Sequence, residues 1–279
     1  KYCKYRKSSS LNNNEYRILN DFLQDRFKGK SKIFITSNYY NDDSSESIKS
    51  RLKINLDKRN IFLFSNVYWD IGLSDFDGLY NDVITWVTRT IQLLDGEDVN
   101  LYIKPHPAEK YDTSSSIKSI REIINENLNY MPNNVFFINP EFKIKPYDLF
   151  PFIDLGIIFS GTLGLEMVLS DLPVVATGKT PYSGLGFIAE PSNEDEYKKY
   201  LIAENKTPYL DKNTIELFAY FYFIRSKIPW NLTNKAFGER FKGFSFNKLD
   251  QILPGKNPQL DHLCKCIMNN DSVPEAWPD

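Results

Sequence analysis

Five short runs of apolar residues, separated by segments with helical spacing, dominate the middle of the chain. The runs have the length of strands and lack polar alternation, which is typical of parallel strands buried on both faces. They are residues 60–66, 99–105, 134–140, 154–160 and 172–178. Residues 82–94, 115–128, 146–153, 162–171 and 193–205 predict intervening helices. This alternation predicts an α/β fold with a Rossmann-like, doubly wound parallel sheet of about 150 residues.

The two ends of the chain are patterned differently from the middle. Before the first apolar run, only residues 15–27 have clear helical spacing. After residue 205 the chain is mostly helical and aromatic, with 213–228 as its longest helical segment. We therefore expect a basic N-terminal segment or remnant of a partner domain over 1–58, the Rossmann-like domain over 59–204, and a mostly helical C-terminal extension over 205–279.

Composition and charge limit the function. The net charge is −2, yet residues 1–59 carry 14 Lys and Arg against 7 Asp and Glu. This basic end is either a solvated face or a contact for anionic lipid, a neighbouring domain or an anionic acceptor. Basic and aromatic residues do not interleave, which disfavours nucleic-acid binding. We expect a cytoplasmic protein, because no apolar run reaches the length of a membrane span and no signal peptide is recognisable.

The three cysteines are Cys3, Cys264 and Cys266. Three are too few for a disulfide framework, and a Cys-x-Cys pair without nearby histidine spacing is a poor metal site. We therefore expect reduced thiols and no bound metal.

Short motifs of unusual composition follow four of the five predicted strands. They are "SNVYWD" (65–70), "KPHPAE" (104–109), "SGTLGLE" (160–166) and "TGKTPYSGLGF" (177–187). In an open parallel sheet, ligands bind outside the carboxyl ends of the strands. The placement of the motifs therefore predicts one ligand site along that edge.

The "SGTLGLE" motif combines small, flexible and hydroxyl-bearing residues at the start of a predicted helix. Ser160, Gly161 and Thr162 there predict a site for phosphate, because backbone N–H groups at a helix start favour anions. The alternative is a simple N-cap, with Glu166 completing an arrangement like a capping box. Capping alone does not explain Gly161 and Gly164 together. Glu166 either accepts hydrogen bonds from ribose hydroxyls or is an exposed helix residue.

The "KPHP" stretch places a histidine between two prolines. Pro105 and Pro107 fix their own φ angles and favour extended neighbours, so they end the strand sharply. His106 is then either part of a turn or a rigidly held imidazole that donates to a phosphate oxygen or a leaving group. We favour the functional interpretation because the predicted phosphate site is near, and Lys104 would add positive charge to the same anion.

The other two motifs supply further candidates. Asp70 either orients an acceptor hydroxyl or acts as a base, or it caps the next turn, and Trp69 either stacks on a sugar or lies in the core. In the last motif Tyr182 and Ser183 would close over a ligand. Lys179 is either a phosphate contact or an ordinary surface lysine.

Taken in order, "NVYWD", "IKPHPAE" and "DLGIIFSGTLGLEMVLSDLPVVATGKTPYSGLGF" resemble the capsule polysaccharide biosynthesis family. That family includes bacterial 3-deoxy-manno-octulosonate (Kdo) transferases. The His-Pro pair followed by a Ser/Thr-rich helix start is also similar to the nucleotide-binding half of bacterial sialyltransferases that use a CMP-sugar. The resemblance covers residues 60–201, about half of the chain.

The resemblance implies a metal-independent GT-B glycosyltransferase, with two Rossmann-like domains facing across a cleft, and makes residues 59–204 its C-terminal-type, nucleotide-sugar-binding domain. It implies that His106 and residues 160–162 hold the donor phosphate and that Glu166 or a neighbour holds the ribose. The loop 179–186 would line the donor pocket, and Asp70 would face the cleft. The first 58 residues are too few for the second α/β domain, so we expect a partner domain or chain to complete the cleft.

The expected function is therefore a glycosyltransferase of bacterial surface polysaccharide biosynthesis, for capsule or lipopolysaccharide. Its donor would be a nucleotide-activated sugar, with a CMP-linked sugar as one option, and no separate cofactor is expected. The acceptor would be a glycan or lipid-linked glycan, which allows peripheral contact with the inner membrane. The alternatives are a glycerophosphotransferase-like enzyme and a non-catalytic nucleotide- or sugar-binding module.

Overall fold

The computed structural model describes residues 10–29, 41, 43–69, 78–110, 118–203, 211–227, 245–246 and 248–271. The chain divides into two compact units. One comprises residues 1–39 with 211–279, and the other comprises residues 40–210. The second unit contains the sheet and all the predicted site motifs, and it starts before the predicted domain boundary at residue 59.

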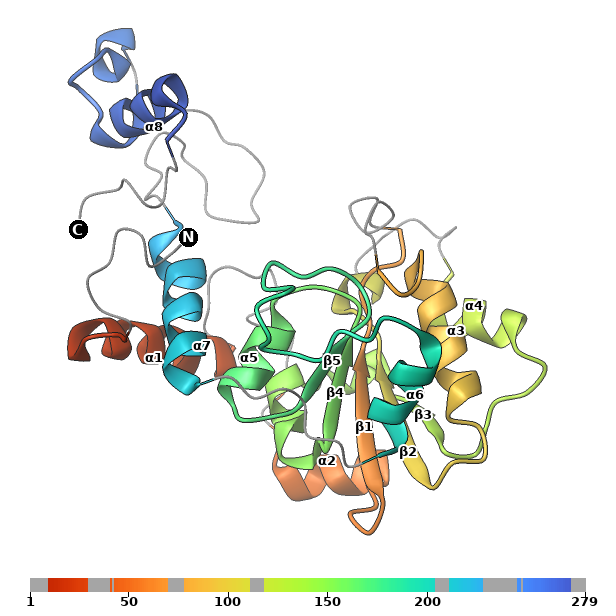
Figure 1. The fold of residues 1–279 in the computed structure, drawn as a ribbon. Helices are drawn as coiled ribbons and strands as arrows, with labels where there is room; N and C mark the ends of the chain where they lie inside the picture. Colours follow the sequence, from red (N-terminus) through yellow and green to blue (C-terminus); the bar gives the residue numbers. More distant parts are fainter. Residues whose placement is uncertain are drawn as a thin grey trace. The chain divides into compact units, whose positions relative to one another are not determined.

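All five predicted strands form, and they make one parallel sheet (Figure 1). The strands are β1 Arg59–Phe64, β2 Val99–Lys104, β3 Val135–Phe137, β4 Leu155–Ile158 and β5 Val174–Ala176. Their order is β3-β2-β1-β4-β5, and every neighbouring pair is parallel. The predicted Rossmann-like, doubly wound fold is therefore confirmed.

Helices of this unit cover both faces of the sheet (Figure 1). The α-helices are α2 Ser45–Leu52, α3 Val83–Leu93, α4 Ile120–Asn127, α5 Leu163–Leu169 and α6 Glu194–Ile202. The 3-10 helices are η3 Pro107–Lys110, η4 Pro140–Phe142 and η5 Pro146–Phe152. Polar side chains at their starts explain several boundaries: Asp82 accepts from the Thr85 N–H, and Ser119 and Glu122 form a capping box.

Odd-numbered strand residues build the core on one face of the sheet. Ile61, Leu63, Leu101, Ile103 and Ile157 pack with apolar side chains of α3, α4 and α6. One buried polar network lies within this core: the Trp86 indole N–H donates to the Tyr197 hydroxyl (3.1 Å), which also bonds Thr90 (2.9 Å). Successive strand side chains point to opposite faces, so the even-numbered residues face the other layer.

Even-numbered strand residues face the layer that contains α5. The rings of Phe62 and Tyr102 stack with centroids 4.8 Å apart. α5 packs closely because Gly156 has no side chain: a Cβ there would lie 2.5 Å from the Met167 sulfur. Lys104, the last residue of β2, has the same parity as Tyr102. Its side chain therefore belongs to this face, at the carboxyl edge of the sheet.

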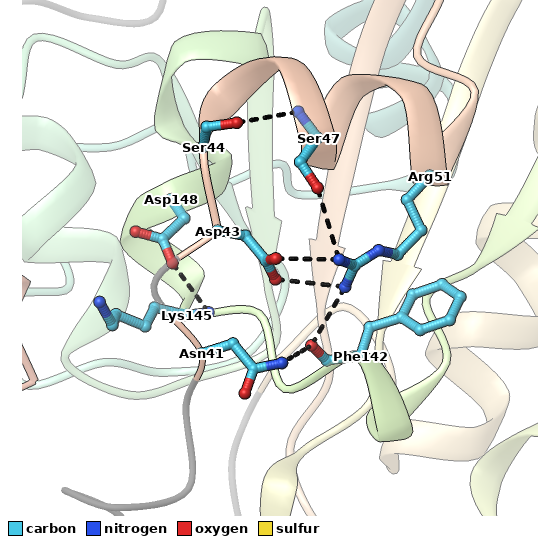
Figure 2. Close-up of polar contacts among 8 residues, drawn as sticks. All are labelled: Asn41, Asp43, Ser44, Ser47, Arg51, Phe142, Lys145 and Asp148. Atoms are coloured by element: carbon cyan, nitrogen blue, oxygen red, sulfur yellow. Dashed lines mark hydrogen bonds and ion pairs between the residues drawn. The ribbon is translucent and has the colours of Figure 1, made fainter.

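Polar contacts attach residue 41 and residues 43–52 to the segment between β3 and β4 (Figure 2). The Arg51 guanidinium makes two hydrogen bonds to the Asp43 carboxylate (2.9 and 3.2 Å). It also donates to the Phe142 carbonyl (3.5 Å) and lies over the Phe142 ring at 5.3 Å. The Asn41 side chain donates to the same carbonyl. These contacts explain why a polar stretch before the first strand folds with the sheet.

The other unit is helical in the part that the structure describes. It contains α1 Asn13–Phe27, α7 Lys212–Tyr220 with a following π-helix Phe221–Arg225, the 3-10 helix Leu249–Ile252 and α8 Pro258–Asn269. Phe22 of α1 packs on Phe223 with centroids 5.3 Å apart, and the Arg26 guanidinium lies over both rings. The predicted helical C-terminal extension is thus present. None of the described helices combines the length and the apolar character that a bilayer crossing requires.

Candidate functional site at the carboxyl edge of the sheet

The strand order reverses between β1 and β4. From β1 the chain proceeds through β2 to β3 on one side, and β4 and β5 lie on the other side. The crevice at such a switch point is where open α/β sheets bind ligands. Residues 65–66 border it from β1, and residues 160–162 border it from β4. Four of the predicted motifs therefore begin at this edge, as their sequence positions indicated.

Asn66 connects the two sides of the switch point. Its side-chain oxygen accepts a hydrogen bond from the Ser160 N–H (3.4 Å). On the other side, the Ser65 N–H donates to the Lys104 carbonyl (3.0 Å) and extends the ladder between β1 and β2. The sequence carries no signal for Asn66, because only the strand order reveals that the end of β1 faces the end of β4.

Lys104 is a buried lysine with little compensation for its charge. Only 7% of the residue is exposed, at the end of the buried strand β2. Burial lowers the pKa of Lys104 to about 8, against which the negative charge of Asp148 acts. The Asp148 carboxylate also accepts from the Lys145 N–H at the start of η5 (3.3 Å, Figure 2). An uncompensated buried charge is costly, and an anionic ligand would offset that cost.

His106 is exposed and follows β2 directly. β2 ends at Lys104, Pro105 is buried, and η3 begins at Pro107. The prediction that the two prolines end the strand is confirmed. The imidazole therefore projects from a short, conformationally restricted loop two residues beyond the buried lysine.

Glu109 lies in the same loop, and the sequence analysis did not select it. One carboxylate oxygen accepts from the Ile120 N–H at the start of α4 (3.1 Å), and the other is buried without a partner among the described residues. Burial raises the pKa of Glu109 to about 7, while the N–H groups of Ile120 and His106 act in the opposite direction. The signal in the sequence was weak, because a Glu after a proline usually belongs to a solvated turn.

The loop after β5 makes hydrogen bonds to the turn between β4 and α5. The Ser160 hydroxyl donates to the Lys179 carbonyl (2.6 Å), and the buried Tyr182 hydroxyl donates to the Gly161 carbonyl (2.8 Å). Gly161 has φ +113°, which disfavours any side chain there. A Cβ on Gly164 would lie 2.4 Å from the Tyr182 hydroxyl. The backbone conformation explains Gly161, and the close packing of Tyr182 explains Gly164. The presence of both glycines therefore no longer favours phosphate binding over capping.

Thr162 is the N-cap residue of α5 by position only. Its side chain makes no capping hydrogen bond, and its own backbone is helical (φ −85°, ψ −19°). The capping-box alternative is therefore wrong for this turn. Because α5 has only seven residues, its dipole is small, and anion binding here would depend on side chains such as the Thr162 hydroxyl.

Glu166 is completely buried in α5, so the alternative of an exposed helix residue is wrong. The Tyr147 hydroxyl of η5 donates to its carboxylate at 2.6 Å, a short, charge-assisted contact. A ribose would reach this carboxylate only after a rearrangement, and the half-buried Tyr147 lies closer to solvent. The ribose role of Glu166 stays a prediction, and Tyr147 joins it as a residue that sequence reasoning did not find.

The remaining predicted residues are spread along the edge. Lys179 is exposed, whereas Tyr182 is fully buried and holds the β4–α5 turn instead of closing over a ligand. The Ser183 hydroxyl accepts from the Thr180 N–H (2.8 Å) inside its own loop. Trp69 is half-buried against Tyr68 (centroids 4.9 Å apart), and Asp70 lies outside the described residues.

Comparisons with known proteins add distant structural likenesses. A scan against protein-family models and a search of curated proteins gave no match. Among solved structures, KpsC of Thermosulfurimonas dismutans, a beta Kdo 2,7 transferase, aligns with a TM-score of 0.41 at 13% identity, covering 79% of this chain and 60% of that one. The KpsC beta Kdo 2,4 transferase of the same organism gives 0.43 at 14% identity, covering 75% and 56%.

A structure from Listeria monocytogenes named as a UDP-N-acetylglucosamine 2-epimerase also aligns, with a TM-score of 0.43 at 14% identity. It covers 67% of this chain and 48% of that one. This chain therefore spans about half to three-fifths of the length of these structures. Two of the three are named as Kdo transferases, but likenesses at these scores assign no activity to this chain.

Proposed function

We propose that this chain belongs to a glycosyltransferase of bacterial surface polysaccharide assembly, for capsule or lipopolysaccharide, which binds a nucleotide-activated sugar at the carboxyl edge of the sheet. The motif resemblance supplies the reaction class. The single observation that carries the site assignment is the burial of Lys104 at the end of β2, where desolvation outweighs the favourable charge of Asp148.

The donor phosphate is the group that fits Lys104. A phosphate oxygen beside the ammonium would provide the charge partner that burial otherwise denies it, and would raise its pKa again. His106 projects from the same strand end, and Thr162 offers a hydroxyl without a capping bond across the switch point. These three groups would form a clamp for one anion, with charge from β2 and a neutral donor from the β4 side.

The chemistry follows from that clamp. An acceptor hydroxyl oxygen forms a bond to the anomeric carbon, and the bond between that carbon and the phosphate oxygen breaks. Negative charge develops on the departing nucleotide phosphate, where Lys104 and His106 stabilise it. The hydroxyl proton passes to a base, for which Asp70 remains the sequence-based candidate. The donor is a substrate, so the proposal requires no separate cofactor.

The acceptor and the remaining half of the cleft come from outside the described fold. We propose a glycan or lipid-linked glycan as acceptor, and a partner domain or chain that completes the cleft over the sheet edge. A cytoplasmic location with peripheral contact to the inner membrane would suit such an acceptor.

A thermal-shift panel of CMP-, UDP-, GDP- and CDP-linked compounds tests the proposal. We expect one nucleotide-sugar class to stabilise the protein and Lys104→Met to abolish that shift. Because Lys104 is buried and charged, the same variant should unfold at a higher temperature than the wild type without ligand. Lys199→Met, at an exposed position of α6, is the matched control and should change neither property.

The outcomes separate the alternatives. A shift with CDP-glycerol instead of a nucleotide-sugar would favour the glycerophosphotransferase-like enzyme. Donor binding without hydrolysis or transfer, even with acceptor glycans present, would favour the non-catalytic module. An unchanged ligand shift in Lys104→Met would contradict the site assignment.

A further inference from the structure

Glu109 makes hydrogen bonds to the start of α4 and to the loop after β2 that carries His106. Its carboxylate accepts from the N–H of Ile120, the first residue of α4, at 3.1 Å. Its own N–H donates to the His106 carbonyl, also at 3.1 Å. Glu109 thereby links the strand end that carries the histidine to the helix that follows.

Both backbone polar groups of His106 interact with this one residue. The His106 carbonyl accepts from the Glu109 N–H, and the His106 N–H faces the Glu109 carboxylate. The flanking residues Pro105 and Pro107 have no N–H groups and supply no such anchor. Glu109 therefore anchors the His106 backbone in addition to the restriction that the two prolines impose.

We infer that Glu109 is a positioning residue, whose ionised carboxylate holds the His106 backbone so that the imidazole stays directed toward the donor phosphate. This inference rests on the proposed function for its ligand. It assigns no contact between Glu109 and the donor.

The surroundings of Glu109 make its charge state adjustable near neutral pH. One oxygen is buried without a partner among the described residues, and burial raises the pKa of the carboxyl group to about 7. The ionisable residues near it are His106, whose backbone it contacts, and Tyr68 after β1; Lys118 and Glu122 at the start of α4 act on Tyr68. The Tyr68 pKa is raised in part by Glu109, which places the two side chains close together.

The sign of the pH effect follows from hydrogen bonding. An ionised carboxylate accepts N–H bonds more strongly than a neutral acid or an amide. Glu109→Gln imitates the neutral form at every pH, so wild type and variant should differ at pH 8 and become alike at pH 5.5.

A first experiment tests positioning without any ligand. We expect the amide NMR signal of Ile120 to shift with a midpoint near pH 7 in the wild type and to lose this transition in Glu109→Gln. At pH 8 the heteronuclear NOE of the His106 amide should fall in the variant, which reports a looser loop. A transition near pH 4.5, or an unchanged NOE, would overturn the inference even if donor binding is confirmed.

A second experiment tests the connection to the donor, with the compound that gives the largest thermal shift as probe. We expect Glu109→Gln to raise Kd about 5- to 10-fold at pH 8, and less than about 2-fold in a His106→Ala background. Glu122→Gln is the control, because Glu122 also bonds backbone at the start of α4 but does not contact His106. Equal effects of Glu109→Gln in both backgrounds would overturn positioning. If no compound binds the wild type, the proposed function fails, while the NMR result still decides the inference.

Discussion

The ends of β2 and β4 carry similar polar motifs, but they differ in how far their polar groups find partners within the fold. At the end of β4, Ser160, Gly161 and Glu166 are bonded to Lys179, Tyr182 and Tyr147 of this same unit. At the end of β2, Lys104 is buried with a lowered pKa, and one oxygen of Glu109 is buried without a partner among the described residues. The first set is satisfied within the fold, and the second is not.

This difference distinguishes polar residues that stabilise the fold from polar residues that are available to a ligand. Buried polar groups in proteins are nearly always hydrogen-bonded, so each exception requires an explanation such as a missing ligand. The β4 end, which the sequence favoured as the phosphate site, has an internal partner for most of its polar groups. The β2 end buries a lysine whose ionisation is disfavoured by desolvation, and it is therefore the better candidate for holding an anion.

The largest expected effect tests the architectural side. Gly164→Ala places a Cβ 2.4 Å from the Tyr182 hydroxyl and 2.5 Å from Ile158. We expect a loss of about 3 kcal/mol in the free energy of unfolding, because overpacking in a tight core is destabilising. Chemical denaturation measures it. In a Tyr182→Phe background the loss should be smaller, and a neutral Gly164→Ala would show that this turn is loosely packed.

The pH dependence of stability tests the β2 end. The pKa of Glu109 rises from 4.5 to about 7 on folding, so between these pH values the folded state keeps a proton that the unfolded state has lost. The contribution of Glu109 to stability is therefore fully present below pH 4.5 and is lost as the pH rises to 7. From pH 5 to pH 8, the free energy of unfolding of Glu109→Gln should rise by about 2 kcal/mol relative to that of the wild type. This value is smaller than the one that the full pKa shift would give, because the side chain is partly exposed.

Urea unfolding at the two pH values measures this difference. Glu122→Gln should not show the gain, because hydrogen bonds from the Ser119 hydroxyl and N–H bring the Glu122 pKa below its ordinary value. A Glu109→Gln difference that is independent of pH would mean that the carboxyl group is solvated, and the contrast between the two strand ends would weaken.

Tyr147→Phe tests the most buried carboxylate of the β4 end. The substitution removes the 2.6 Å hydrogen bond to Glu166 and keeps the ring that packs edge-on against Phe150. We expect a loss of about 1–1.5 kcal/mol, within the range for an intramolecular hydrogen bond. Thermal and urea unfolding provide the value. If stability is unchanged and donor affinity falls, the pair belongs to the binding site instead of the architecture.

The smallest stability effect is expected at Thr162. Its hydroxyl makes no capping bond, so Thr162→Val should change the free energy of unfolding by no more than about 0.5 kcal/mol. Donor Kd should nevertheless rise severalfold, because the clamp loses its donor from the β4 side. Unfolding curves and a donor titration on the same sample compare the two. A stability loss without a binding loss would return Thr162 to a structural role.

The fold was accessible from the sequence because its strands are buried on both faces. Continuous apolar runs of strand length, such as 60–66 and 99–105, indicate buried parallel strands when they alternate with segments of helical spacing. Helix boundaries were less accurate: the predicted segment 115–128 becomes α4 at Ile120, where Ser119 supplies the cap. A capping residue inside an apolar-periodic stretch competes with the periodicity, and here it determines the boundary.

The site was only partly accessible, because sequence shows residue types and not which of them find partners. Lys104 and His106 were selected from their place after a strand. Asn66 and Tyr147 needed the strand order and the packing of η5, which connect residues far apart in the chain. Glu166 has the spacing of an ordinary helix residue, and only the tertiary contact with Tyr147 reveals that it is buried.

Proton uptake on donor binding tests the central claim most directly. At pH 8 the Lys104 ammonium is about half ionised, since its pKa is about 8. A phosphate bound beside it raises that pKa, so binding should draw up to about half a proton from the buffer. Titration calorimetry of the donor that binds, in two buffers with different ionisation enthalpies, measures the uptake. We predict uptake in the wild type and in Lys199→Met, and a markedly smaller uptake or no measurable binding in Lys104→Met. Equal affinity and equal uptake in Lys104→Met would contradict the account.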